Sequence, residues 1–214
     1  MRKITALEQQ KRNKDRVSVF LDGEYSFGLT LEAAAGLRVG QELTDEAIAQ
    51  IKDRETLVRA RQSAFRFVSY RPRSVAEVRR NLLSKEYDET IVEMIINDLI
   101  EREYLDDEAF AAYWVEQRQT FKPRSRLALR HELYEKGVPR DVIARVVDTV
   151  DESKAADRAA EKRAHRWSDY TREAFQEKMI AYLRRRGFNY RTAKRATEGA
   201  WQTLNEIDTP SQRR

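Results

Sequence analysis

The spacing of hydrophobic residues divides this chain into two parts. In about the first 30 residues apolar and polar positions alternate, which is the period-two pattern of a half-buried β-strand. Beyond residue 55 apolar residues recur every three or four positions, as they do on one face of an α-helix. The pattern therefore predicts a small β-containing module in residues 1–54, followed by a helical part.

The strongest strand signal is a hairpin. Arg16–Leu21 and Glu24–Leu29 both alternate, and Asp22-Gly23 between them supplies the positive φ angles that a two-residue hairpin turn needs. We expect this hairpin to be the centre of the N-terminal module. Further elements are predicted at Lys3–Gln10 (a third strand), at Leu31–Ala35 (a short helix) and from Thr44 (a helix capped by its hydroxyl).

The helical part repeats itself. Arg71-Pro72-Arg73-Ser74 opens a segment that returns 51 residues later, without a gap, at Lys122-Pro123-Arg124-Ser125, and Leu82 then falls on Leu133. A weaker third copy aligns Leu183–Gly187 with Leu133–Gly137. Self-similarity at this period indicates one supersecondary unit copied and stacked.

We therefore expect a mainly α protein. The predicted architecture is three tandem three-helix repeats in an elongated, curved array, with a small N-terminal β-hairpin module. The expected divisions are 1–54 for the module, 55–106, 107–153 and 154–208 for the repeats, and 209–214 for a disordered tail.

Repeat one shows how each unit is expected to fold. Its first helix should run from about Thr56 to Tyr70 and stop at Pro72. Ser74 should cap the second helix, with Glu77 completing a capping box. The third helix is expected to bury a stripe made of Ile91, Met94, Ile95 and Leu99, and Leu82 and Leu133 should be equivalent core positions.

Composition excludes several classes of site. The chain has no Cys and two isolated His, so we expect no disulfide and no metal site, and no Gly-rich phosphate loop is present. No apolar run approaches the roughly 20 residues that span a bilayer, and no signal peptide is evident. These features predict a soluble cytoplasmic protein with no catalytic centre and no cofactor.

The charge is distributed unevenly. The net charge is +5, and residues 155–214 hold 14 basic and 8 acidic residues. No acid lies between Glu55 and Glu77, between Glu116 and Glu132, or between Glu177 and Glu198. One basic face per repeat is typical of a protein that binds a polyanion or an acidic protein surface, although such runs are also common on solvated surfaces. The candidate partner- or DNA-binding residues are Arg71, Arg73, Arg79, Lys122, Arg124, Arg126, Arg130, Arg184, Arg185, Arg186, Arg191, Lys194 and Arg195.

Arg73 and Arg124 are the strongest single candidates. Each stands beside a helix N-terminus, where free N–H groups favour anions that an arginine can hold in a bidentate fashion. Asp106 and Asp107 are better explained as helix caps than as a metal or acid–base pair. Packing is likewise favoured over base stacking for the three tryptophans, Trp114 in repeat two and Trp167 and Trp201 in repeat three.

These motifs together resemble the RecX family of recombinase regulators. The resemblance rests on the Arg71–Ser74 turn and on the junction Tyr104-Leu105-Asp106-Asp107-Glu108-Ala109-Phe110-Ala111, and it covers about residues 56–204. Many members also carry an N-terminal β-hairpin extension. The chain departs from the pattern in its divergent third repeat and at Glu86, where glycine is common. Because a glutamate is tolerated there, we expect that turn to avoid a strictly positive φ.

The resemblance implies a function that composition alone does not. It implies a non-catalytic monomer that binds the RecA filament on single-stranded DNA and lies in its groove. There it would modulate, mostly inhibit, the recombinase and coprotease activities of RecA in DNA repair, recombination and the SOS response. The residues themselves leave an alternative open, namely a repeat protein that binds single-stranded nucleic acid on its own.

Overall fold

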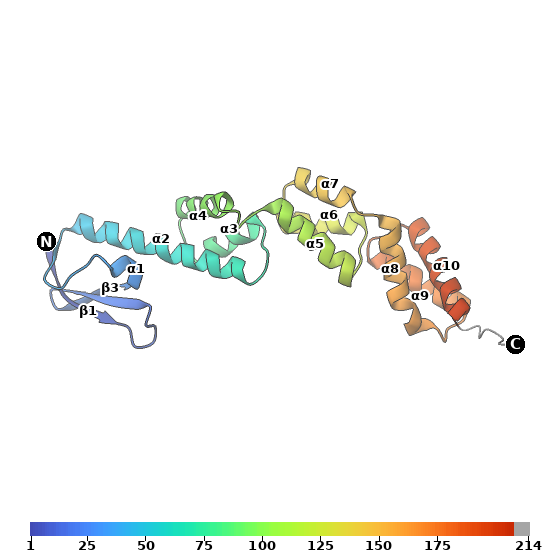
Figure 1. The fold of residues 1–214 in the computed structure, drawn as a ribbon, viewed down its shortest axis with the longest axis horizontal. Helices are drawn as coiled ribbons and strands as arrows, with labels where there is room; N and C mark the ends of the chain where they lie inside the picture. Colours follow the sequence, from blue (N-terminus) through green and yellow to red (C-terminus); the bar gives the residue numbers. More distant parts are fainter. Residues whose placement is uncertain (208–214) are drawn as a thin grey trace. The chain divides into compact units, whose positions relative to one another are not determined.

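A computed structural model describes residues 1–207, and the expected tail at 209–214 lies outside the described residues. The chain forms two compact units (Figure 1). The first unit comprises Met1–Arg71 and Val78–Tyr104. The second comprises Pro72–Glu77 and the chain from Leu105 onward.

An antiparallel sheet with strand order β3-β2-β1-β4 begins the first unit. Its hairpin turn has φ of 53° at Asp22 and 88° at Gly23, so the predicted Asp-Gly turn is confirmed. The fourth strand was not predicted, because two residues are too short to show an alternating pattern. The elements are β1 (Arg2–Gln9), β2 (Arg16–Leu21), β3 (Glu24–Thr30), the short helix α1 (Leu31–Ala34) and β4 (Glu42–Leu43).

A buried carboxylate ties this sheet to helix α2 (Asp45–Ser69). Glu55 is only 5% exposed, and its Oε2 accepts hydrogen bonds from the Thr30 backbone N–H at 2.6 Å and the Thr30 hydroxyl at 3.1 Å. Its Oε1 lies 3.0 Å from Nη1 of Arg16, whose Nη2 also donates to the Gly28 carbonyl at 3.1 Å. A buried charge needs such pairing and hydrogen bonding, so Glu55 holds the sheet to the helix at a defined position.

Helix α2 is longer than the sequence suggested. Thr44 caps it as predicted, by accepting a hydrogen bond from the Ala47 N–H at 3.1 Å. The helix then continues without a break to Ser69, whereas a new helix was expected at Thr56. The expected division between residues 54 and 55 thus falls inside α2.

The remaining helices of repeat one are α3 (Val75–Leu83) and α4 (Glu89–Glu101). The expected stripe on the third helix was wrong at Met94, which is 55% exposed, because the helix turns a neighbouring face inward. Both faces of the helix have helical spacing, so the periodicity of the sequence did not distinguish the buried face from the exposed one. The buried residues on these helices are Val78, Leu82, Val92, Ile95, Ile96 and Leu99.

The expected conformation of the turn after α3 was also wrong. Glu86 has φ of 63°, in the left-handed region that the presence of a non-glycine residue seemed to exclude. It occupies the same place in repeat one as Gly137 and Gly187 in the later repeats, which have φ of 78° and 90°. The turn therefore has a positive φ in all three repeats. Because Glu86 adopts it without being glycine, a further constraint must require glycine at positions 137 and 187.

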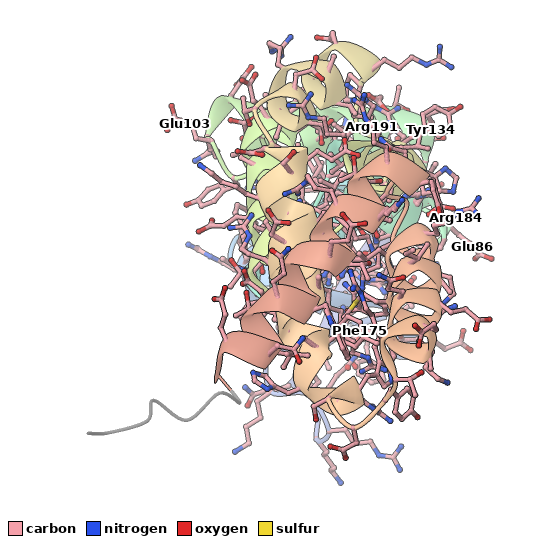
Figure 2. All side chains as sticks on the ribbon, turned by 90° about the vertical axis from the view of Figure 1, so that its right-hand side faces the viewer. Glu86, Glu103, Tyr134, Phe175, Arg184 and Arg191 are labelled. Atoms are coloured by element: carbon pink, nitrogen blue, oxygen red, sulfur yellow. The ribbon has the colours of Figure 1, made fainter. Side chains whose placement is uncertain are left out.

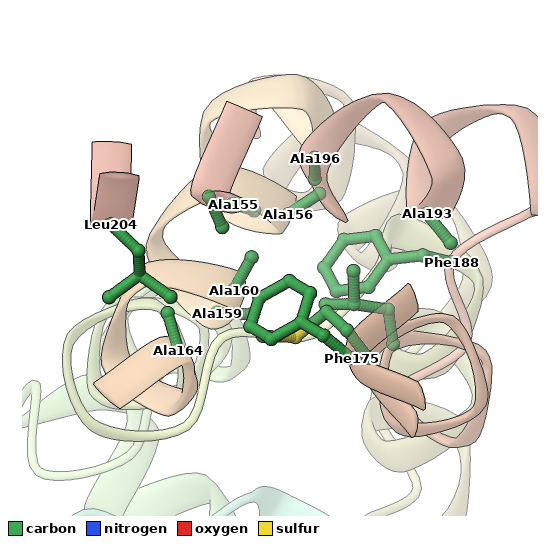
Figure 3. Packing of buried hydrophobic residues seen from close by; sticks show 13 residues of the cluster. Ala155, Ala156, Ala159, Ala160, Ala164, Phe175, Phe188, Ala193, Ala196 and Leu204 are labelled. Atoms are coloured by element: carbon green, nitrogen blue, oxygen red, sulfur yellow. The ribbon is translucent and has the colours of Figure 1, made fainter. Parts of the chain in front are cut away.

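The second unit holds two three-helix groups. In the first group Leu133 is fully buried, as Leu82 is in repeat one, so their predicted equivalence is confirmed. In the second group, the small alanine side chains of α8 lie in one buried cluster with Phe175 and Phe188 (Figure 3). The helices are α5 (Asp107–Phe121), α6 (Arg126–Glu135) and α7 (Arg140–Asp148), then α8 (Glu152–Ala164), the 3-10 helix η1 (His165–Trp167), α9 (Arg172–Arg185) and α10 (Tyr190–Ile207).

The fold class is thus mainly helical with an N-terminal antiparallel sheet, as predicted. The division of the chain at 54, 106, 153 and 208 stays a prediction, as does the elongated, curved arrangement of the repeats.

Candidate interaction surface

The Pro-Arg-Ser turns lie at contacts between successive repeats, all within the second unit. At the first joint, which we define as Ser74–Ala76 against Lys136–Gly137, the Ser74 hydroxyl donates to the Lys136 carbonyl at 2.6 Å. The same hydroxyl caps α3 by accepting from the Glu77 N–H at 3.1 Å, as predicted. Ser74 therefore both begins its own helix and binds the turn that ends helix α6.

The second joint, which we define as Pro123–Ser125 against Arg186–Gly187, connects the equivalent positions through different donors. The backbone N–H of Ser125 donates to the Arg186 carbonyl at 3.1 Å, and Nη1 of Arg186 donates to the Pro123 carbonyl at 3.1 Å. The Ser125 hydroxyl caps α6 by accepting from the Ala128 N–H at 3.1 Å. The recurring turn thus serves as a structural connection.

Close approach explains why the two joints need glycine. A Cβ at Gly137 would lie 2.3 Å from the Cβ of Ala76, and one at Gly187 would lie 2.4 Å from the Ser125 hydroxyl oxygen. Carbon atoms normally approach no closer than about 3.5 Å. Glu86 ends its helix with the same positive φ as these glycines. Glycine is therefore required at the joints by packing as well as by φ.

One of the two favoured arginines is bound inside its own repeat. Nε of Arg124 lies 2.7 Å from Oε1 of Glu132, while Oε2 of Glu132 lies 2.6 Å from Nε of Arg118 and accepts from Nε1 of Trp114 at 2.8 Å. The Arg118 guanidinium also lies 4.4 Å from the centre of the Trp114 ring. Trp114 thus packs within a charged cluster, and reversing the charge of Arg124 would disturb the fold as well as any binding.

Most of the other predicted cations also have partners. Arg71 and Arg73 are half-buried, and neither is without an interaction partner. These contacts leave their side chains less available to an external anion than sequence alone suggested. The remaining pairs are Arg79 with Glu93, Arg126 with the Val150 carbonyl, Arg130 with Asp148, Lys194 with Glu198 and Arg195 with Asp157.

Four predicted cations differ from these. Lys122, Arg184, Arg185 and Arg191 are exposed, and within residues 1–207 their side chains make no ion pair or hydrogen bond. Figure 2 shows Arg184 at the edge of the ribbon, whereas Phe175 lies among the helices. These four cations lie close to the second joint in sequence.

Asp106 and Asp107 cap two different helices. Asp106 caps α5 by accepting from the N–H groups of Glu108 at 2.7 Å and Ala109 at 3.2 Å. Asp107 accepts from the Val75 N–H at 3.0 Å, at the first turn of α3. Burial raises the pKa of Asp107, with a smaller opposing effect from the Val75 hydrogen bond. Both carboxylates therefore act as helix caps. Sequence alone did not reveal that Asp107 caps a helix from another repeat.

Neither a metal-binding cluster nor a membrane-spanning helix occurs in residues 1–207. That part of the chain contains no group of three or more His, Cys, Asp or Glu side chains arranged to hold a metal ion. None of its helices combines the length and apolar character that crossing a bilayer requires.

Comparison with protein families identifies three matching segments. Residues 2–44 match the regulatory protein RecX N-terminal domain, residues 60–109 the first three-helix domain of RecX, and residues 106–147 its second three-helix domain. Together these segments cover more than half of the chain.

Relatives extend the match along nearly the whole chain. A regulatory protein RecX from Listeria monocytogenes is 28% identical over 211 residues, which cover 96% of this chain and 78% of the relative. One from Clostridium botulinum is 29% identical over 197 residues, covering 89% and 92% respectively.

Solved structures agree on the fold. A crystal structure of regulatory protein RecX gives a TM-score of 0.60 at 23% identity, covering 95% of this chain and 94% of that one. The crystal structure of RecX from Lactobacillus salivarius gives 0.57 at 23% identity, covering 71% and 98%. With the matching domains and the tandem three-helix groups, these similarities establish that the chain belongs to the RecX family of non-catalytic regulatory proteins.

Proposed function

We propose that this protein binds the RecA filament on single-stranded DNA and mostly inhibits its recombinase and coprotease activities. The observation that carries the proposal is family membership over both the N-terminal and the three-helix domains. The protein would act in the cytoplasm as a monomer, in DNA repair and recombination. It would regulate by binding alone.

The distribution of charge supports this proposal. A filament on DNA is a polyanion coated with protein, so a partner needs both a basic surface and a scaffold that extends along it. Within the second unit, the second joint holds two three-helix groups together and so supplies part of such a scaffold. The unpaired cations beside the second joint supply exposed positive charge.

The test is the single-stranded-DNA-dependent ATPase of RecA, followed while this protein is titrated in at constant salt. The proposal predicts a fall in ATPase rate at protein concentrations well below that of RecA, and slower RecA-stimulated repressor cleavage over the same range. An ATPase unchanged up to equimolar protein would contradict the proposal.

A second candidate function is direct binding of single-stranded nucleic acid without a recombinase, and the unpaired cations favour it specifically. A titration of the protein with DNA in the absence of RecA distinguishes the two candidate functions. A stand-alone binder should bind tightly, with a steep dependence on salt concentration. A filament regulator should act on RecA even under salt conditions where it no longer binds naked DNA.

A further inference from the structure

We infer that the second joint carries a binding surface for single-stranded DNA, made of exposed aromatic rings beside unpaired cations. We define the second-joint surface as Phe121, Lys122, Arg184, Arg185, Tyr190 and Arg191. The inference rests on the proposed function and deepens it, because it assigns the direct contact with DNA to one joint.

First, the second joint brings two acid-free segments together. No Asp or Glu occurs between Glu116 and Glu132, or between Glu177 and Glu198. The hydrogen bonds of Arg186 with Pro123 and Ser125 hold these two segments against each other. The joint therefore brings together two basic stretches, neither of which contains a carboxylate of its own.

Second, the two joints differ in charge. At the first joint the turn reads Tyr134-Glu135-Lys136, and the Lys136 ammonium lies 2.9 Å from Oε1 of Glu77. At the second joint the same three positions read Arg184-Arg185-Arg186. At both joints a serine donates to the carbonyl of the third position, through its hydroxyl at the first and its backbone N–H at the second, while the charge changes from balanced to positive. The side chains of Arg184 and Arg185 take no part in the hydrogen bonds of the joint, so a role in binding anions accounts for their charge.

Third, the exposed cations are available. Lys122, Arg184, Arg185 and Arg191 are exposed, and they form no ion pair or hydrogen bond with the part of the chain that the structure describes. Such a cation can bind a phosphate without giving up an internal partner. The paired cations of repeats one and two, such as Arg124 with Glu132, would have to break an existing ion pair first.

The aromatic residues point to a single strand. Phe121 is 67% exposed and directly precedes Lys122, while Tyr190 is 58% exposed and directly precedes Arg191. Exposed rings next to phosphate-binding cations allow unpaired bases to stack while the backbone is neutralised. Bases in a duplex already stack on one another, so this arrangement favours single-stranded DNA over double-stranded DNA and over an acidic protein.

The test uses the full-length protein and a fluorescein-labelled oligo(dT), with binding followed by fluorescence anisotropy in the absence of RecA. Arg184→Glu with Arg185→Glu should weaken binding at least tenfold at low salt. The salt dependence should also become shallower, by about 0.7 in the logarithmic slope for each phosphate that the variant no longer neutralises. Phe121→Ala with Tyr190→Ala should weaken binding about tenfold while changing that slope little.

The matched control reverses two exposed arginines elsewhere. Arg54→Glu with Arg59→Glu on α2 changes the net charge by the same amount, and it should alter affinity less than twofold. The inference is overturned if the control weakens binding as much as the Arg184 and Arg185 pair, or if that pair has no effect. An aromatic pair without effect also overturns it, since the surface would then bind anions in general. Thermal unfolding midpoints equal to that of the wild type ensure that each variant is folded.

The RecA ATPase assay with wild-type protein separates this inference from the proposed function. If wild-type protein leaves RecA unaffected but the variants lose oligo(dT) binding as described, the proposed function fails and the surface stands. If wild-type protein inhibits RecA and the variants bind oligo(dT) normally, the surface fails and the proposed function stands.

Discussion

Gly137→Ala is expected to destabilise the protein strongly, because it affects both the backbone and the first joint. Gly137 has φ of 78°, and a left-handed conformation costs a non-glycine residue about 1–2 kcal/mol. The new methyl group would also lie 2.3 Å from the Cβ of Ala76, more than 1 Å inside normal carbon contact. Overpacking of this kind costs about 1–3 kcal/mol. The free energy of unfolding should therefore fall by about 2–5 kcal/mol.

Two companion variants separate the two effects. Gly40 has φ of 94°, and no atom lies within 4 Å of the place that an added methyl group would take, so Gly40→Ala measures the backbone effect alone, about 1–2 kcal/mol. Ala76→Gly removes the atom that Gly137→Ala would strike. The double variant should therefore recover about 1–3 kcal/mol relative to the sum of the single variants.

Urea unfolding followed by circular dichroism at 222 nm supplies these free energies. The prediction is wrong if Gly137→Ala costs no more than Gly40→Ala. It is also wrong if the effects of Gly137→Ala and Ala76→Gly simply add, because Ala76 and Gly137 would then not be in close contact in solution.

Other perturbations have equally definite outcomes in the same assay. Leu133→Ala should lower the free energy of unfolding by about 2–5 kcal/mol because Leu133 is fully buried, and a loss under about 0.5 kcal/mol would mean that the wrong face is inward. Glu55→Gln should cost about 3–5 kcal/mol because it leaves the half-buried Arg16 without its charged partner, and a neutral result would contradict the proposed tie between sheet and helix. The hydrogen bond from Arg102 lowers the pKa of Asp98 below its ordinary value of 3.8, so the stability from this pair is present above that pH and lost as the pH falls through the lower folded-state value. Asp98→Asn should therefore reduce the loss of stability on acidification below about pH 4, and an unchanged pH profile would refute that assignment.

Sequence predicted the parts of the fold that local chemistry determines. The Asp22-Gly23 turn and the Ser74 cap depend on residues within a few positions of one another, so short motifs were enough. The match of Leu82 with Leu133 came from the internal repeat, which copies packing along with sequence.

Tertiary contacts decided what the sequence left ambiguous. Helix α4 has two candidate apolar faces, and only packing shows that Met94 lies outside. Glu86 takes positive φ because the turn requires it in every repeat, while glycine is needed only where Ala76 or Ser125 approaches. That distinction depends on atoms more than 60 residues apart, and no local pattern contains it.

The candidate surface illustrates the same limit. Acid-free stretches identified the basic residues, but not which of them were already paired, because partners such as Glu132 for Arg124 lie on another turn of the fold. The exposed rings of Phe121 and Tyr190 were not among the predicted residues. Both rings directly precede a cation in an acid-free stretch, and this pattern could have identified them from the sequence.

Co-sedimentation with RecA filaments assembled on single-stranded DNA tests the proposed function most directly. We predict that wild-type protein sediments with the filament and saturates at a fixed ratio to RecA. Binding should persist at salt concentrations where the protein no longer binds naked DNA, and filament mass should fall or strand exchange slow as it binds. Protein that stays in the supernatant at every ratio, while RecA sediments normally, would contradict the proposed function.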